Sequence, residues 1–88
     1  MFVGPADLSA DMGYPGTPGH PEVRATIEAG LAAIRAAGKA PGIIAFDPQE
    51  VAEFARLGAR FLGVGADAGA LAGALGRLAE EARQGLVP

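Results

Sequence analysis

The segment FVGPADLSADMG, residues 2–13, decides how the rest of the sequence is interpreted. A short apolar run, typical of a strand, turns at Gly4-Pro5 and is followed by the carboxylate of Asp7. Residues 9–19 are rich in Gly and Pro, which predicts a loop rather than a helix directly after the strand. A loop of this length in a compact domain is usually functional or disordered. Asp7 is therefore the first candidate for chemistry.

Two other apolar runs, residues 42–46 and 61–66, also end in an aspartate. If the three runs are neighbouring parallel strands, the three aspartates lie at the carboxyl-terminal edge of one sheet, where such sheets place their sites. Asp47 and Asp67 each stand just before a predicted helix, so we interpret them as helix caps. Asp7 has no predicted helix close behind it, and a hard carboxylate at a strand end suits Mg²⁺ or Mn²⁺.

Hydrophobic spacing and helix-start and helix-end signals predict three strands alternating with three helices. We expect strand residues at 1–4, 40–46 and 60–64, and helices at about 21–37, from Pro48 to Gly58, and at about 68–84. This order predicts right-handed crossovers and a parallel sheet in an α/β fold. Three such strands cannot close a barrel and leave apolar edges, so the sequence is typical of part of a larger sheet.

Each predicted helix has one apolar face. In the first helix the face comprises Val23, Ile27, Gly30, Leu31 and Ile34; in the second, Val51, Phe54 and Ala55; and in the last, Leu71, Leu75, Leu78 and Ala82. Three glycines weaken the last helix by about 1 kcal/mol each relative to Ala, so packing must hold it.

Composition limits the function classes. With 88 residues the chain is at most one domain and buries only about 60–65% of its unfolded surface. A net charge of −3 gives no basic field for a phosphate backbone, so we expect no nucleic-acid partner. The sequence has no Cys, no signal-like amino terminus and no membrane-length apolar run, which favours a soluble cytoplasmic protein with no membrane partner. A mean hydropathy of +0.27 predicts some apolar surface in contact with other protein.

Three other groups are weaker candidates. We interpret Asp11 as an exposed turn residue and His20, the only histidine, as part of a helix-capping turn. The turn from Gly63 to Gly69 is similar to a phosphate-binding turn at a helix start, but it lacks the full G-x-G-x-x-G pattern. Its glycines are equally explained by close approach of helix and strand.

Four segments together carry a family resemblance: FVGPADLS at residues 2–9, GHPEV at 19–23, AAGK at 36–39 and FLGVGAD at 61–67. In this order they strongly resemble the carboxyl-terminal third of the HpcH/HpaI family of metal-dependent, pyruvate-forming class II aldolases. The resemblance implies a (β/α)₈ TIM barrel, with residues 1–88 as its sixth to eighth strands and their helices in one domain. It also implies a homo-oligomer, usually a hexamer, whose last helix is exchanged between subunits.

The resemblance further implies site residues and a reaction. Asp7 matches the aspartate that binds the divalent ion, which could be Mg²⁺, Mn²⁺ or Co²⁺. Gly4, Pro5 and Ala6 match the turn against the pyruvate carboxylate, and Ile44 matches a pocket-lining position. The implied lyase reaction breaks or forms a C–C bond between pyruvate and an aldehyde, with a 4-hydroxy-2-oxo acid as the joined form, through a metal-stabilised pyruvate enolate.

The family's remaining metal-site glutamate, its carbonyl-polarising arginine and its proton-transfer residues lie on earlier strands. We therefore expect no catalytic residue within this segment and little or no aldolase activity from the chain alone. Three hypotheses stay open: a segment that is active only within a full barrel, a non-catalytic structural or oligomerisation segment, and a small anion-binding module that uses the turn at Gly63.

Overall fold

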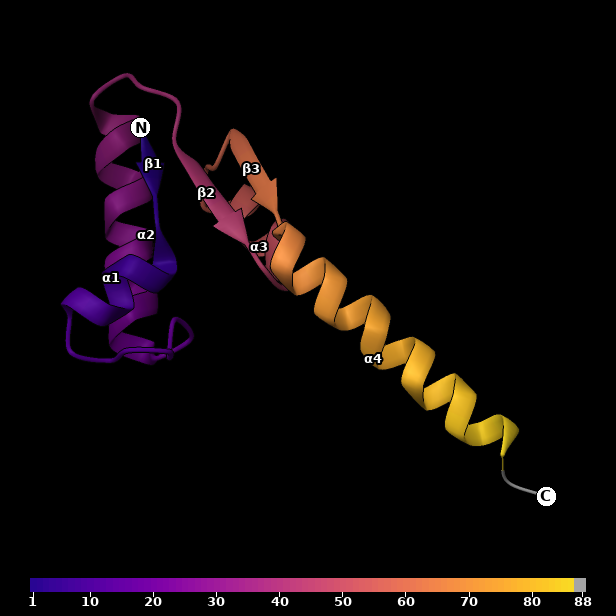
Figure 1. The fold of residues 1–88 in the computed structure, drawn as a ribbon. Coiled ribbons are helices and arrows are strands. Elements are labelled where there is room, and N and C mark those ends of the chain that lie inside the picture. The colour runs from indigo at the N-terminus through magenta and orange to yellow at the C-terminus, as the bar shows by residue number, and fades with distance from the viewer. Residues whose placement is uncertain (87–88) are drawn as a thin grey trace.

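The computed structural model describes residues 1–86, which form a small parallel sheet, two helices packed on it, a short helix beside one of them and a long projecting helix (Figure 1). The elements in chain order are β1 (Phe2–Val3), α1 (Pro5–Asp11), α2 (Pro21–Ala36), β2 (Gly42–Ala45), α3 (Glu50–Arg56), β3 (Phe61–Val64) and α4 (Asp67–Gly85). All strand pairs are parallel and β2 is central, in the order β1-β2-β3. The predicted α/β class and parallel three-stranded sheet are confirmed, with strands shorter by one to three residues than expected.

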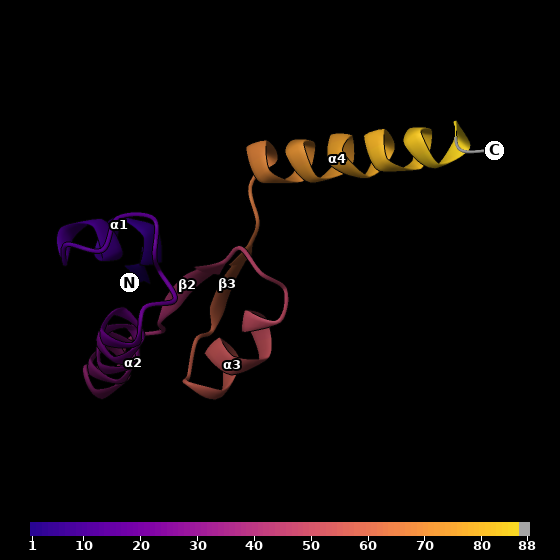
Figure 2. The ribbon, with the colours of Figure 1, turned by 90° about the horizontal axis from the view of Figure 1, so that it is seen from below.

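Register assigns the strand side chains to two faces. Val3 pairs with Ile43, and Ile43 with Leu62, so these residues share one face. Phe2 pairs with Gly42, and Gly42 with Phe61, which places these residues on the opposite face. Helices α2 and α3 lie on the same side of the sheet (Figure 2), and the core lies between them and the face that carries Ile43.

Helix α2 supplies most of the core. Val23, Ile27, Leu31 and Ile34 are all buried, as their helical spacing predicted, whereas Gly30 is only half-buried. The helix begins where the proline at its first position is already preorganised for helical φ. It ends before Gly38, whose φ of +77° is a left-handed conformation that glycine adopts without strain.

Helix α3 adds one large side chain to the core. Phe54 is buried and Val51 is half-buried, in agreement with the prediction, but Ala55 is exposed and its prediction as an inward-facing residue was wrong. In a helix of only seven residues, Phe54 and the half-buried positions define the inner face, and the next residue turns away. Gly58, with a φ of +102°, follows the last turn, where the sequence predicted the end of the helix.

Helix α1 was not predicted. Residues 5–11 are helical, so the predicted loop at residues 9–19 was wrong for residues 9–11 and confirmed for residues 12–19, and Asp7 lies in the first turn of a helix rather than before a loop. Pro5 occupies a first-turn position and Asp7 complements the positive end of the helix. The helix has seven residues, and the Gly- and Pro-rich segment interrupts helical structure only after it, where Gly13 has a φ of +89°.

Helix α4 extends away from the rest of the molecule (Figures 1 and 2) and gives the described chain dimensions of 60 × 27 × 18 Å. Its bounds are close to the prediction, but none of its residues is buried. The apolar stripe is exposed along its length, with Leu71 at 62%, Leu75 at 56% and Leu78 at 61%. The packing that was expected to hold this helix is therefore not supplied by residues 1–86.

Candidate functional site

A pocket of about 450 Å³ opens at the carboxyl-terminal end of β1 and β2. It is lined by Phe2, Gly4, Pro5, Ala6, Asp7, Ile44 and Phe46. All five predicted site residues are in this set, although Ile44 is far from the others in sequence. The parallel pairing of β1 with β2 brings the two segments together.

Two further residues, Phe2 and Phe46, line this pocket and were not predicted as site residues. Phe2 pairs with Gly42, two residues before Ile44, and Phe46 follows Ile44 by two residues just beyond β2, so strand alternation directs all three to the same side. Strand alternation could therefore have identified them once the register was known.

The turn that carries Asp7 is fixed by its own backbone. Gly4 is extended, and its carbonyl accepts a hydrogen bond from the Leu8 amide at 2.9 Å. Asp7 folds back over Gly4, because a Cβ at Gly4 would lie 3.4 Å from Oδ2 of Asp7. Ser9 is fully buried and its hydroxyl donates to the Ala6 carbonyl at 2.9 Å. The carboxylate therefore projects from a turn that is anchored on both sides.

The aspartates that follow the three strands differ in the hydrogen bonds that their carboxylates accept. Oδ1 of Asp47 accepts the Gln49 amide at 3.0 Å, and Oδ1 of Asp67 accepts the Ala68 amide at 2.8 Å. Both carboxylates therefore accept nearby backbone amides, but their interpretation as helix caps was wrong. The N-cap positions are Gln49 and Ala66, neither with a side-chain cap hydrogen bond, because α3 begins only at Glu50 and α4 already at Asp67. The carboxylate of Asp7 accepts no hydrogen bond from the residues described, and it is exposed to the pocket.

This carboxylate suits one ligand position of a hard divalent ion, because anionic oxygen is the donor that Mg²⁺ and Mn²⁺ prefer. Residues 1–86 contain no group of three or more His, Asp or Glu side chains placed to hold a metal. The pocket thus fits one ligand of such an ion, and these residues do not form a complete metal site by themselves.

The loop after α1 is held by a cluster around Tyr14. The Tyr14 ring stacks on His20 with centroids 3.8 Å apart, and the Tyr14 hydroxyl donates to Oε2 of Glu22 at 2.6 Å. The Glu22 carboxylate raises the pKa of Tyr14, because a hydroxyl that donates to an anion gives up its proton less readily. Nδ1 of His20 accepts the Glu22 amide at 3.2 Å, which confirms His20 as part of the capping turn. Asp11 is exposed at the end of α1.

The turn at Gly63 leads into α4 through Gly65, whose φ is +79°. A hollow of about 640 Å³ lies beside this turn. The Asp67 carboxylate accepts the Ala68 amide in the first turn of the helix, where a bound phosphate would have to compete with it. This geometry disfavours the anion-binding hypothesis for the turn.

No helix within residues 1–86 has the length and apolar character needed to cross a membrane.

Comparison with known proteins identifies relatives of this chain. The sequence profile described as HpcH/HpaI aldolase/citrate lyase matches residues 1–74. A 4-hydroxy-2-oxo-heptane-1,7-dioate aldolase from Shigella sonnei is 54% identical over 79 residues, and one from Escherichia coli is 53% identical over the same length. In both cases the match covers 90% of this chain, and the chain spans 30% of the relative.

Solved structures give the same result. An HpcH/HpaI aldolase/citrate lyase family protein from Burkholderia cenocepacia superposes with a TM-score of 0.83 at 39% identity, over 93% of this chain and 32% of the other. An HpcH/HpaI aldolase from Desulfitobacterium hafniense superposes with a TM-score of 0.87 at 26% identity, over 99% of this chain and 33% of the other. The sequence match and the fold agree, and the chain belongs to the HpcH/HpaI aldolase/citrate lyase family, whose carboxyl-terminal third it matches.

Proposed function

We propose that this chain forms strands six to eight of a TIM-barrel aldolase and contributes one part of its active site. The reaction is cleavage or formation of the C–C bond between pyruvate and an aldehyde, with a 4-hydroxy-2-oxo acid as the joined form. The observation that carries the proposal is the pocket in which Asp7, the Gly4–Ala6 turn and Ile44 come together at the carboxyl-terminal end of the strands. This end is where TIM barrels carry their sites.

The side chains on the open face of the sheet support the proposal of a TIM barrel. Phe2 and Phe61 come from the two outer strands and meet edge to face, with ring centroids 6.2 Å apart. Between them β2 has Gly42, where a Cβ would lie only 2.8 Å from the Phe2 ring. Two residues further along the same face, the large and small residues change places. Here the central strand β2 carries the large side chain, Ile44, and its partner on β3 is Gly63. Layers filled by alternate strands are typical of a TIM-barrel interior.

Each pocket residue has a role in the proposed site. The backbone of Gly4, Pro5 and Ala6 lies against the pyruvate carboxylate, and a side chain at Gly4 would press on Asp7. Ile44 and Phe46 form an apolar wall that excludes water from the reacting carbons. Asp7 provides one anionic oxygen ligand for a divalent ion, Mg²⁺, Mn²⁺ or Co²⁺.

A divalent ion bound there would supply Lewis-acid chemistry, holding the keto acid through its oxygens and stabilising the negative charge that develops on the pyruvate unit. The remaining ligands and the acid–base groups would come from protein outside these residues. We therefore propose that the isolated chain has little or no aldolase activity.

Paramagnetic broadening by Mn²⁺ tests the role of Asp7 in the isolated chain. Weak binding is expected, with amide signals of residues 4–8 broadened first and more strongly when pyruvate is present. Asp7→Ala should remove this pattern. Asp11→Ala is the matched control, because it removes the same charge from the same helix outside the pocket. Broadening that survives in Asp7→Ala and disappears in Asp11→Ala would refute the assignment.

A second candidate is a structural segment whose role is assembly, as part of a homo-oligomer that is a hexamer in the family resemblance. The exposed leucines of α4 and the exposed Phe2 and Phe61 favour it. This candidate predicts a concentration-dependent oligomer in sedimentation velocity that forms equally well with and without Mn²⁺ and pyruvate. An oligomer that requires either ligand would instead support the aldolase site.

A further inference from the structure

A second recess lies at the opposite, amino-terminal end of the sheet. It has a volume of about 280 Å³ and is lined by Arg35, Gly38, Lys39, Ala40, Pro41 and Arg60. These residues come from the end of α2, the segment before β2 and the residue before β3. The recess is therefore separate from the Asp7 pocket, and nothing in the proposed aldolase chemistry uses it.

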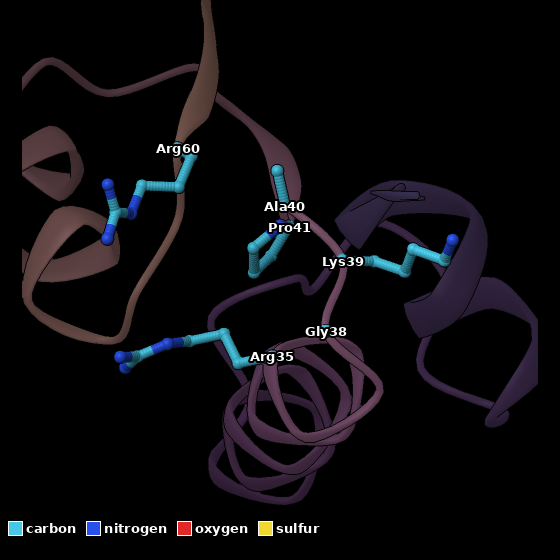
Figure 3. Close-up of a pocket in the computed structure, with 6 residues that line it drawn as sticks. All are labelled: Arg35, Gly38, Lys39, Ala40, Pro41 and Arg60. Carbon is cyan, nitrogen blue, oxygen red and sulfur yellow. The ribbon is translucent and has the colours of Figure 1, made fainter.

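Three of the seven Lys and Arg residues of the chain line this recess, although the chain as a whole carries a net charge of −3. No acidic residue lines it. Arg35 and Arg60 extend to the same side of the Ala40-Pro41 segment, and Lys39 extends to the other side (Figure 3). The recess is therefore positively charged within an acidic molecule.

The two ends of α2 differ in how their arginines are neutralised. Near its start, Arg24 pairs with both Glu50 and Glu53 and lies 4.8 Å from the centre of the Phe54 ring. Near its end, Arg35 forms no ion pair with any residue in 1–86, and neither do Lys39 and Arg60. The carbonyls at the end of α2 give Arg35 only a partial counter-charge.

Arg35 is held in place by packing. Its side chain lies against Gly58, where a Cβ would be 2.3 Å from Cδ and 2.8 Å from Nη1 of Arg35. Gly58 is buried, and Arg60 follows two residues later, directly before β3. The close approach at Gly58 therefore keeps one guanidinium beside the segment that carries the other.

We infer that this recess binds a small oxyanion such as phosphate between the guanidinium groups of Arg35 and Arg60. Guanidinium presents paired N–H donors that match the oxygens of such an anion. Bound anion would also relieve the repulsion between the two like charges. Lys39 contributes to the local positive potential from the far side of the Ala40-Pro41 segment.

Thermal unfolding of the full 88-residue chain in inorganic phosphate tests this inference, with chloride at equal ionic strength as the reference. Phosphate at ten times its Kd should raise Tm by about 6 °C or more. Arg60→Gln should weaken the phosphate affinity about tenfold or more, because it removes a charged hydrogen-bonding partner. Arg83→Gln is the control, since Arg83 is an exposed arginine on α4 outside the recess.

Arg35→Lys gives an independent measurement if Arg60→Gln does not fold, because it retains the charge and removes the paired donors. A lower phosphate affinity in Arg35→Lys, with the unliganded Tm unchanged, would support the site. Equal Tm shifts with phosphate and chloride would overturn the inference. So would a phosphate shift that is the same in wild type, Arg60→Gln and Arg35→Lys.

Discussion

The two faces of the sheet are both apolar, but residues 1–86 cover only one of them. On the covered face, Ile43 is 0% and Ala45 is 1% exposed under α2 and α3. On the open face, Phe2 is 50% and Phe61 is 69% exposed. Burial of large aromatic side chains is among the main favourable terms in folding. The open face is therefore built for contacts that these residues do not make among themselves.

The helices repeat this difference. Helix α2 buries four apolar side chains against the sheet, whereas α4 buries none. Both helices carry apolar stripes at helical spacing. An apolar stripe indicates that a helix is to be packed, but it does not identify what packs against it. The following predictions test whether the covered and open regions differ in energy as they do in exposure.

Matched Phe→Ala substitutions on the two sides should differ most. Phe54 is 1% exposed, so Phe54→Ala should lower the free energy of unfolding by about 3–5 kcal/mol through lost burial and the cavity left behind. Phe61→Ala should cost about 1 kcal/mol or less, mainly the edge-to-face contact with Phe2. Urea unfolding followed by circular dichroism measures both. Equal losses would show that the open face is already covered in the isolated chain.

Matched Leu→Ala substitutions should separate the two helices. Leu31→Ala, in the core face of α2, should lower the free energy of unfolding by about 2–4 kcal/mol. Leu75 on α4 is 56% exposed, so Leu75→Ala should change the free energy of unfolding by about 0.5 kcal/mol or less. Urea unfolding followed by circular dichroism measures both losses, first at a low protein concentration and then at higher ones. A large loss in Leu75→Ala that grows with protein concentration would show that α4 packs on another copy.

Gly42→Ala probes the open face directly. The added methyl group would meet the Phe2 ring at 2.8 Å and Phe61 at 3.3 Å, so the aromatic pair must move apart. In the isolated chain the exposed Phe2 can rotate away, and we expect a loss of about 1 kcal/mol. Near-ultraviolet circular dichroism and urea unfolding follow the change. A loss as large as that of Phe54→Ala would mean that Phe2 is fixed by contacts beyond those described.

The smallest effect concerns the loop beside α1. Tyr14 is the only tyrosine, so its ionisation can be followed by absorbance without labels. Its pKa should lie above the ordinary value of 10.0 because of the Glu22 carboxylate, and Glu22→Gln should lower it towards that value. Because the folded-state pKa is raised, this contact stabilises the fold below pH 10 and is lost as pH rises through the folded-state pKa. An unchanged titration in Glu22→Gln would contradict the observed hydrogen bond.

Much of the fold followed from local pattern. The spacing of Val23, Ile27 and Leu31 predicted α2 and its buried face, and Gly58 predicted the end of α3. Helix α1 was missed because seven residues give too little periodicity to compete with the Gly and Pro that follow. Local pattern alone could not predict the exposure of α4, since the stripe of Leu71 and Leu75 is the same whether or not a partner is present, although the family resemblance implied a last helix that packs on another subunit.

The candidate site was predicted in part. The residue pattern and the resemblance both indicated Asp7, the resemblance alone supplied the Gly4–Ala6 turn and Ile44, and the structure places all of them around one pocket. The reason first given for singling out Asp7 was wrong, because Asp7 also lies at the start of a helix, in the first turn of α1. The three aspartates are all exposed, and the distinction rests instead on hydrogen bonding: Asp47 and Asp67 accept backbone amides, whereas Asp7 accepts none from the residues described.

The central claim is that this segment is competent within an aldolase barrel and inactive without one. It is tested most directly by replacing the corresponding segment of the Shigella sonnei aldolase, 54% identical over 79 residues, with this chain and measuring pyruvate release from the 4-hydroxy-2-oxo acid. We predict measurable activity in the chimera, loss of about a hundredfold or more with Asp7→Ala, little change with Asp11→Ala, and no activity from the isolated chain. A folded chimera that keeps full activity with Asp7→Ala, or an isolated chain that cleaves the substrate by itself, would contradict the account.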